Sequence, residues 1–113
     1  MKHRCADMLM ELELAKSTVR FASHSMATMP NDDQLAQSYD VLSSTLPGTL
    51  PSMAKAMASD VYMTIAKAAV QLRGGIGFTW ENDTHLWFKR AKSSEVFLGS
   101  PHVHRERMMC LLE

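Results

Sequence analysis

A glycine-rich turn is the part of this sequence whose residue types could do chemistry. It reads Gln71-Leu72-Arg73-Gly74-Gly75-Ile76-Gly77 and follows a long run with helical periodicity. Glycines lack a β-carbon, so the neighbouring backbone amides can approach a ligand closely. Phosphate loops precede a helix and use its positive N-terminus, whereas this turn follows one, which excludes the P-loop and the dinucleotide-fold fingerprint. Chemistry alone favours a helix C-cap, with Gly74 left-handed, over a ligand loop.

Other candidate chemical groups have simpler explanations. Glu81 and Glu95 are the nearest alternative carboxylates, and exposure to solvent is the usual situation of glutamate. His102 and His104 suggest a metal pair, but their positions on a helix diverge by about 200°. A surface location is therefore favoured for all four side chains.

Large apolar side chains predict a helical core with some slack in its packing. The ten methionines suit irregular gaps between helices better than a ligand groove. Trp80, Trp87 and Phe88 could line a pocket, but packing against a helical bundle is favoured.

Composition points to a soluble, cytoplasmic protein of one domain. The 113 residues carry a formal net charge of zero, which gives no broad electrostatic reason to expect nucleic acid or an anionic membrane. No apolar run approaches the roughly 20 residues that span a bilayer, and no signal peptide is visible. Cys5 and Cys110 lie near opposite ends, and reduced thiols are favoured over a disulfide.

The first half of the chain contains the expected partners of a bundle. A long helix is predicted from Lys2 to Ser25, with Glu11, Glu13, Lys16 and Arg20 on a solvated face. Its apolar stripe follows steps of three and four through Cys5, Met8, Leu12, Ala15, Val19, Ala22 and Met26. A break at Met29–Asp33 and a weaker helix from Asp32 to Ser43 follow.

The second half is organised by turns. The prolines and glycine of Leu46–Pro51 predict an interruption, and the strongest helix prediction runs from Ser52 to Leu72, where abundant alanines indicate a central position. Beyond the glycine turn, further helices are predicted at Thr84–Phe97 and His102–Leu112, separated by Leu98–Pro101. No run alternates long enough for a strand. We therefore expect an all-α, up-down helical bundle of four to five helices, with residues 1–113 as a single domain.

Several segments resemble the acyl-CoA dehydrogenase family, over nearly the whole chain and in the right order. QLRGGIGFTWE at Gln71–Glu81 is similar to the signature in which a long helix ends in Gln-x-x-Gly-Gly-x-Gly. Lys89–Lys92 resembles the Arg-Asp-Ala-Arg/Lys stretch that follows it. The first helix, with Ala6-Asp7-Met8 and Glu11–Ala15, resembles the family's Ala-Asp-Met helix with its Leu-Ala turn.

The resemblance implies a C-terminal four-helix bundle that contributes flavin and subunit contacts in an enzyme of fatty acid metabolism. Gln71, Gly74 and Gly75 would approach the flavin adenine dinucleotide (FAD) of a neighbouring subunit, and Ser100 would keep the hydroxyl of the family's threonine near the flavin. The implied reaction is α,β-dehydrogenation of an acyl-CoA thioester. A carboxylate removes the α-proton while the β-hydride passes to the flavin. A homo-oligomer or a partner subunit is implied as well.

Leu98 departs from the family pattern. Many members carry the catalytic carboxylate in a Tyr-Glu-Gly-Thr stretch, and the matching residues here are Phe97-Leu98-Gly99-Ser100. Either the base lies on an earlier helix, or the chain pairs with an active partner. The resemblance covers only the C-terminal domain of the family, so we expect a fragment without the N-terminal and middle domains that is inactive alone. The alternative is a stand-alone helical module for dimerisation or partner binding; a metal-dependent hydrolase is disfavoured.

Overall fold

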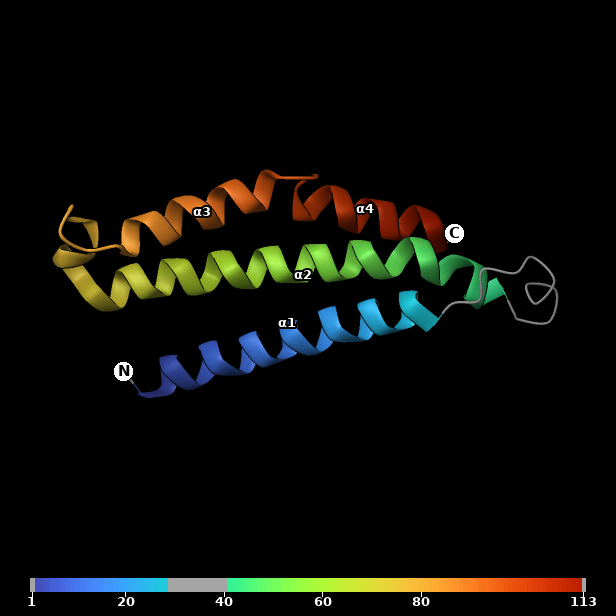
Figure 1. Ribbon diagram of the computed structural model, residues 1–113, viewed down its shortest axis with the longest axis horizontal. Coiled ribbons are helices and arrows are strands. Elements are labelled where there is room, and N and C mark those ends of the chain that lie inside the picture. Colours follow the sequence, from blue (N-terminus) through green and yellow to red (C-terminus); the bar gives the residue numbers. More distant parts are fainter. Residues whose placement is uncertain (1, 29–40, 113) are drawn as a thin grey trace.

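The computed structural model describes residues 2–28 and 41–112, and it contains no strand within these ranges. Its helices are α1 (Lys2–Thr28), α2 (Val41–Arg73), the 3-10 helix η1 (Gly74–Phe78), α3 (Thr84–Val96) and α4 (Pro101–Leu112). Figure 1 shows α1 antiparallel to α2, with α3 and α4 end to end along another side of α2. The predicted all-α bundle is confirmed.

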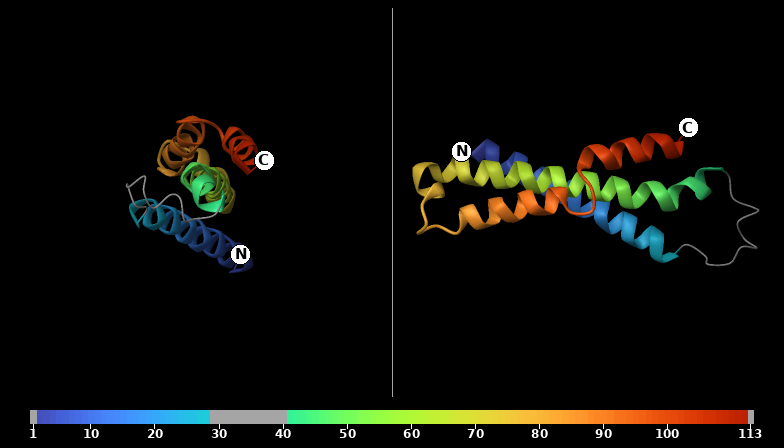
Figure 2. Two further views of the ribbon diagram at one scale, coloured as in Figure 1. Left: turned by 90° about the vertical axis from the view of Figure 1, so that its right-hand side faces the viewer. Right: turned by 90° about the horizontal axis from the view of Figure 1, so that it is seen from above.

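Helix α2 is the centre of the bundle. It contacts α1, η1, α3 and α4, and the end-on view in Figure 2 shows α1 on one side of it and α3 with α4 on the other. Residues that face several directions from α2 are buried, among them Ala56, Val61, Ala66 and Val70. Small side chains let neighbouring helices approach closely, so the central position predicted for this helix is confirmed.

The predicted interruption at Leu46–Pro51 is wrong, because α2 begins at Val41 and continues through both prolines. Each proline removes one backbone donor from the helix, which normally favours a break. Here packing against other helices outweighs the effect of the prolines, because Thr49, Leu50 and Ser52 are buried. Of the weaker helix predicted at 32–43, residues 32–40 lie outside the described residues and residues 41–43 belong to α2.

Gly48 helps to explain why α2 continues. A β-carbon built at this position would lie 2.9 Å from Leu111 Cδ1 of α4, so the bare glycine permits close contact between the two helices. The Ser52 hydroxyl donates to the Gly48 carbonyl at 3.4 Å and supplies an additional bond in this stretch. Contacts distant in sequence therefore stabilise a segment that local propensity disfavours.

The buried face of α1 is rotated by about one residue from the predicted stripe. Ala15 and Ala22 are buried as expected, but Leu12, Val19 and Met26 are 38%, 43% and 43% exposed. The side chains at positions 11, 18 and 25 are half-buried instead. Thr18 illustrates the shift, since its hydroxyl lies 3.7 Å from Met57 Sδ of α2. The face of α1 against α2 is therefore made largely of small and polar residues.

Helices α2 and α3 meet around a compact apolar cluster. Met63 and Ala66 of α2 are buried with Ala91 of α3, and Tyr62 and Phe88 pack against them. Ala91 is 1% exposed, so the two helices lie in close contact at this point. This cluster holds the middle of α3 against α2.

Lys55 connects α2 to the end of α3. Its ammonium donates to the carbonyls of Ser94 at 3.0 Å and Glu95 at 3.4 Å, and to the Ser59 hydroxyl at 2.6 Å. The last carbonyls of a helix have no partner within the helix and carry partial negative charge. A lysine from the neighbouring helix therefore caps α3.

Replacement of Lys55 by methionine tests this cap. The substitution keeps a long unbranched side chain and removes the donors, so the free energy of unfolding should fall by about 1.5–3 kcal/mol. Urea denaturation gives the value. Lys16→Met is the control, because Lys16 forms an exposed pair with Glu13 at 2.7 Å and its loss should cost less than about 1 kcal/mol. Equal losses for the two variants would contradict the capping role.

Candidate functional site

The glycine turn closes α2 with the expected left-handed residue. Gly74 has φ of +62°, which confirms the predicted C-cap conformation. The chain then continues as η1, and the Thr79 backbone N–H donates to the Ile76 carbonyl at 3.2 Å. The turn is thus a short ordered helix end.

The three glycines of the turn have different physical roles. A β-carbon at Gly74 or Gly75 would meet no atom within 4 Å, and both residues are exposed. At Gly74 the positive φ itself favours glycine, whereas Gly75 has neither a positive φ nor a close neighbour. A β-carbon at Gly77 would lie 3.0 Å from the Val70 carbonyl oxygen, so this glycine is needed for packing. Gly75 is the position where bare backbone faces open space.

Asn82 holds the loop that follows the turn. Its side-chain oxygen accepts hydrogen bonds from the Arg73 guanidinium, from the Thr84 backbone N–H at 3.1 Å and from the Thr84 hydroxyl at 2.6 Å. The end of α2 and the start of α3 are therefore bound to one amide. This residue was not among those predicted from the sequence, although asparagine just before a helix start is a capping signal.

The aromatic residues beside the turn do not all pack as predicted. Trp80 is 86% exposed, with Lys89 Nζ 5.5 Å from its ring centroid and the His85 ring at 5.3 Å. Trp87 is 57% exposed and lines a groove between α2 and α3. Only Phe88 joins the apolar cluster. The Trp80 ring thus contacts His85 and Lys89 at the surface and is not part of the apolar cluster.

Gln71 is exposed and faces a cleft between α1 and α2. This α1–α2 cleft has a volume of about 440 Å³. It is lined by four residues of α1 and four of α2, namely Arg4, Asp7, Met8, Glu11, Thr64, Lys67, Ala68 and Gln71. Glu11 was expected on the solvated face, but its Oε2 atom is buried and has no hydrogen-bond partner. Gln71 therefore belongs to a charged cleft beside the turn.

The junction of α3 and α4 is a second unusual turn. Leu98 has φ of +62° and Gly99 φ of +104°, and Leu98 is 76% exposed. His104 Nε2 donates to the Leu98 carbonyl at 3.0 Å, and the His104 backbone N–H donates to the Ser100 carbonyl at 3.2 Å. The 13 residues of α3, about 20 Å in length, separate Ser100 from the glycine turn. The structure does not bring Ser100 together with Gln71, Gly74 and Gly75.

Replacement of Leu98 by glycine should raise stability. The left-handed conformation costs a non-glycine residue about 1–2 kcal/mol, and the exposed side chain contributes little burial in return. We expect the free energy of unfolding to rise by about 1 kcal/mol, measured by thermal or urea denaturation. Phe97→Gly is the control, since φ of Phe97 is −61° and it should gain nothing. A loss of stability for Leu98→Gly would show that the leucine makes contacts that this account omits.

Neither alternative carboxylate has the surroundings of a general base. Glu95 accepts a hydrogen bond from Lys92 at 2.6 Å, and this ammonium lowers the pKa of the Glu95 carboxyl. A lowered pKa weakens a carboxylate as a proton acceptor. Glu81 is exposed, as predicted, and His102 pairs with Glu106 at 3.4 Å. No group of three metal-ligating side chains occurs in the described part of the chain.

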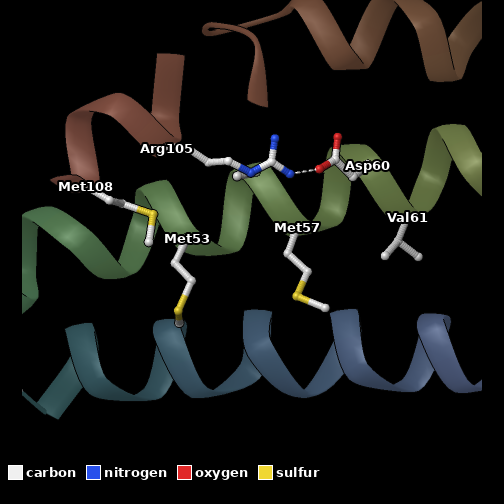
Figure 3. Close-up of a pocket in the computed structure, with 7 residues that line it drawn as sticks. Met53, Met57, Asp60, Val61, Arg105 and Met108 are labelled. Carbon is white, nitrogen blue, oxygen red and sulfur yellow. Dashed lines mark hydrogen bonds and ion pairs between the residues drawn. The ribbon is translucent and has the colours of Figure 1, made fainter. Parts of the chain in front are cut away.

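Methionines line a groove beside the middle of α2. Its volume is about 290 Å³, and Figure 3 shows Met53 and Met57 directed toward α1, with Met108 coming from α4. Arg105 of α4 pairs with Asp60 of α2 beside it. At this point three of the methionines border an open groove between helices, whereas the sequence had favoured methionines that fill gaps in the core.

Fold and turn together define a helical domain whose central helix ends in exposed glycine backbone. The family model for the acyl-CoA dehydrogenase C-terminal domain matches residues 1–110. The chain therefore belongs to the acyl-CoA dehydrogenase family, as a member of its C-terminal domain.

Curated relatives agree with this assignment. Acyl-CoA dehydrogenase IpdE2 of Mycobacterium tuberculosis is 36% identical over 108 residues, which are 96% of this chain and 28% of that protein. Acyl-CoA dehydrogenase FadE34 of the same organism is 36% identical over 116 residues, covering 99% of this chain and 14% of its own length. The chain thus spans less than a third of these relatives. No solved structure gives a significant match. No helix in the described ranges is long and apolar enough to cross a membrane.

Proposed function

We propose that this chain is the C-terminal helical domain of a flavin-dependent acyl-CoA dehydrogenase, contributing cofactor and subunit contacts and lacking activity by itself. The observation that carries the proposal is the glycine turn, where Gly75 presents bare backbone to open space at the end of the central helix. Family membership supplies the reaction class, the α,β-dehydrogenation of an acyl-CoA thioester.

The residues of the turn suit an FAD molecule held by a neighbouring subunit. Gln71 offers an amide that can donate and accept, and a β-carbon at Gly74 or Gly75 would meet no atom within 4 Å, so a ligand can approach the chain there. When bound, the flavin supplies hydride acceptance, while these residues orient its polar nucleotide portion. Ser100, on a separate turn, has a hydroxyl without a partner in the described residues, so it would contact a different part of a flavin site.

The lack of a carboxylate at the sequence position where many family members carry the base would explain why the chain is inactive alone. Leu98 has no group that accepts a proton, and Glu95 is engaged by Lys92. The α-proton of the thioester would then be removed by a carboxylate on another segment or on a partner subunit. Such a division of labour requires the domain to act within a larger assembly.

A chimera tests the proposal. The chain replaces the matched C-terminal segment of M. tuberculosis IpdE2, and reduction of an artificial electron acceptor by acyl-CoA thioesters is measured. We expect turnover in the chimera and none with the isolated chain plus added FAD. A folded chimera without turnover, under conditions where the intact relative is active, would contradict the proposal.

Exposed apolar side chains on α1 favour the second candidate, a helical interaction module. Leu12, Val19 and Met26 form one row, with seven-residue spacing, and Leu14 and Phe21, 55% and 59% exposed, form another. Such rows are typical of protein contact surfaces. If this face binds a second copy, light scattering after size exclusion should give a dimer that Leu12→Ser with Val19→Ser dissociates. A monomer at all concentrations would rule out self-association.

A further inference from the structure

The turn between α3 and α4 holds a leucine in a conformation that leucine seldom adopts. Leu98 has φ of +62°, and Gly99 follows with φ of +104°. Leu98 is 76% exposed, so burial of its side chain does not compensate for the strain of the left-handed backbone. A strained residue of this kind persists where surrounding contacts hold it, and such residues are common at functional sites.

His104 of α4 supplies a contact that holds this turn. Its Nε2 donates to the Leu98 carbonyl at 3.0 Å, and the ring lies so close to Gly99 that a β-carbon there would be 3.2 Å from Nε2. A carbonyl only accepts, so Nε2 carries the proton. The Nδ1 atom is shielded from solvent and has no hydrogen-bond partner in the described part of the chain. The bond to Leu98 therefore sets the orientation of the ring.

Both hydrogen bonds of His104 act on the backbone around Ser100. The side chain binds the carbonyl of Leu98, just before the serine, and the backbone N–H donates to the carbonyl of Ser100 itself at 3.2 Å. Other residues at position 104 would keep the backbone bond, but only a side chain with a donor can keep the bond to Leu98. Because Ser100 follows Gly99 directly, the conformation of the turn sets the direction of the Ser100 hydroxyl.

We propose that His104 is a positioning residue of the flavin site. By holding the Leu98 carbonyl it maintains the left-handed turn, and the turn directs the Ser100 hydroxyl toward the cofactor. The inference rests on the proposed function, in which Ser100 contacts the flavin. His104 acts through the turn and does not itself touch the cofactor.

Nuclear magnetic resonance of the isolated chain tests the structural half of the proposal. At positive φ the N–H and Hα of Leu98 lie on the same side of the backbone, which gives a strong nuclear Overhauser effect between them. His104→Leu keeps a side chain of similar size without the donor and should weaken this signal, whereas His104→Gln, which restores a donor, should retain it. His102→Leu is the control, because His102 is exposed on the same helix. An unchanged Leu98 signal in a folded His104→Leu chain would overturn the proposal.

Turnover by the chimera with IpdE2 tests the functional half. His104→Leu should lower kcat by about tenfold, the factor that one hydrogen bond supplies, and His104→Gln should restore it to within about threefold. KM for the thioester and the flavin content should change little. Because His104 acts through Ser100, His104→Leu should have no further effect on kcat in a Ser100→Ala background. Additive losses, or a Ser100→Ala chimera with unchanged turnover, would contradict the positioning role.

Leu98→Gly provides a rescue that a general structural role would not allow. Glycine adopts positive φ without strain, so the turn no longer depends on His104. We expect the double variant Leu98→Gly with His104→Leu to turn over at nearly the rate of Leu98→Gly alone, and a full loss in the double variant would contradict the proposal. An inactive parent chimera would contradict the proposed function, while the resonance comparison on the isolated chain still decides whether His104 holds the turn.

Discussion

Replacing Met63 with alanine is expected to lower the free energy of unfolding by about 2–5 kcal/mol. Met63 is 7% exposed and forms the apolar cluster between α2 and α3 with Ala66 and Ala91. Truncation removes most of the buried side chain and leaves a cavity. The alanine neighbours cannot fill it, because they have no side-chain length to move. Urea denaturation followed by circular dichroism measures the loss.

Met10→Ala is the control for the Met63→Ala substitution. Met10 lies on α1 and is 68% exposed, so the same chemical change should alter stability by no more than about 0.5 kcal/mol. Similar losses for Met63 and Met10 would mean that the cluster does not hold α3 against α2. In that case the cluster would not hold in place the glycine turn that joins α2 to α3.

The second large effect is expected at Gly77. A β-carbon there would lie 3.0 Å from the Val70 backbone oxygen and 3.3 Å from Arg73 Cβ, and backbone cannot move aside cheaply. Gly77→Ala should therefore cost about 1–3 kcal/mol of unfolding free energy. Gly75→Ala is the matched control two residues away, because the added carbon meets nothing within 4 Å.

Gly75→Ala should leave stability unchanged or raise it slightly, since alanine restricts the unfolded chain. Comparison of Gly77→Ala with Gly75→Ala therefore distinguishes a glycine needed for packing from a glycine that leaves the backbone open to a ligand. An equal loss for both variants would show that Gly75 is a packing residue rather than an open approach to a ligand. Thermal denaturation of the isolated chain is sufficient for this comparison.

Most helices could be predicted from the sequence because they depend on local signals. The starts and ends of α3 and α4 agree within one residue with those expected from the glycine and proline positions. The left-handed Gly74 was also predictable, because helix ends require residues that tolerate positive φ. Periodicity and turn chemistry were sufficient for these elements.

Features that depend on distant contacts could not be predicted in this way. The continuation of α2 through Pro51 depends on packing that includes Leu111 of α4 against Gly48. Glu11 faces α2 because of the side of α1 that packs against that helix. Apolar residues at steps of three and four fit two adjacent sides of α1 equally well, so the sequence does not determine which side is buried. Local propensity contains no information about either choice.

The candidate site was predicted only in part. Gln71, Gly74 and Gly75 were selected by family resemblance, while the α1–α2 cleft required the pairing of two helices far apart in sequence. Leu98 was identified as a departure from the family pattern, but its positive φ was not foreseen, because leucine seldom adopts this conformation.

The most direct test of the account is the flavin content of the purified chimera carrying this domain. Absorbance of the bound flavin, relative to protein, is measured for the chimera and for its Gly75→Val variant. We expect flavin to be retained by the parent chimera and largely lost from the variant, because a branched side chain would fill the open space at the turn. Full retention of flavin by a folded Gly75→Val chimera would contradict the claim that this turn contacts the cofactor.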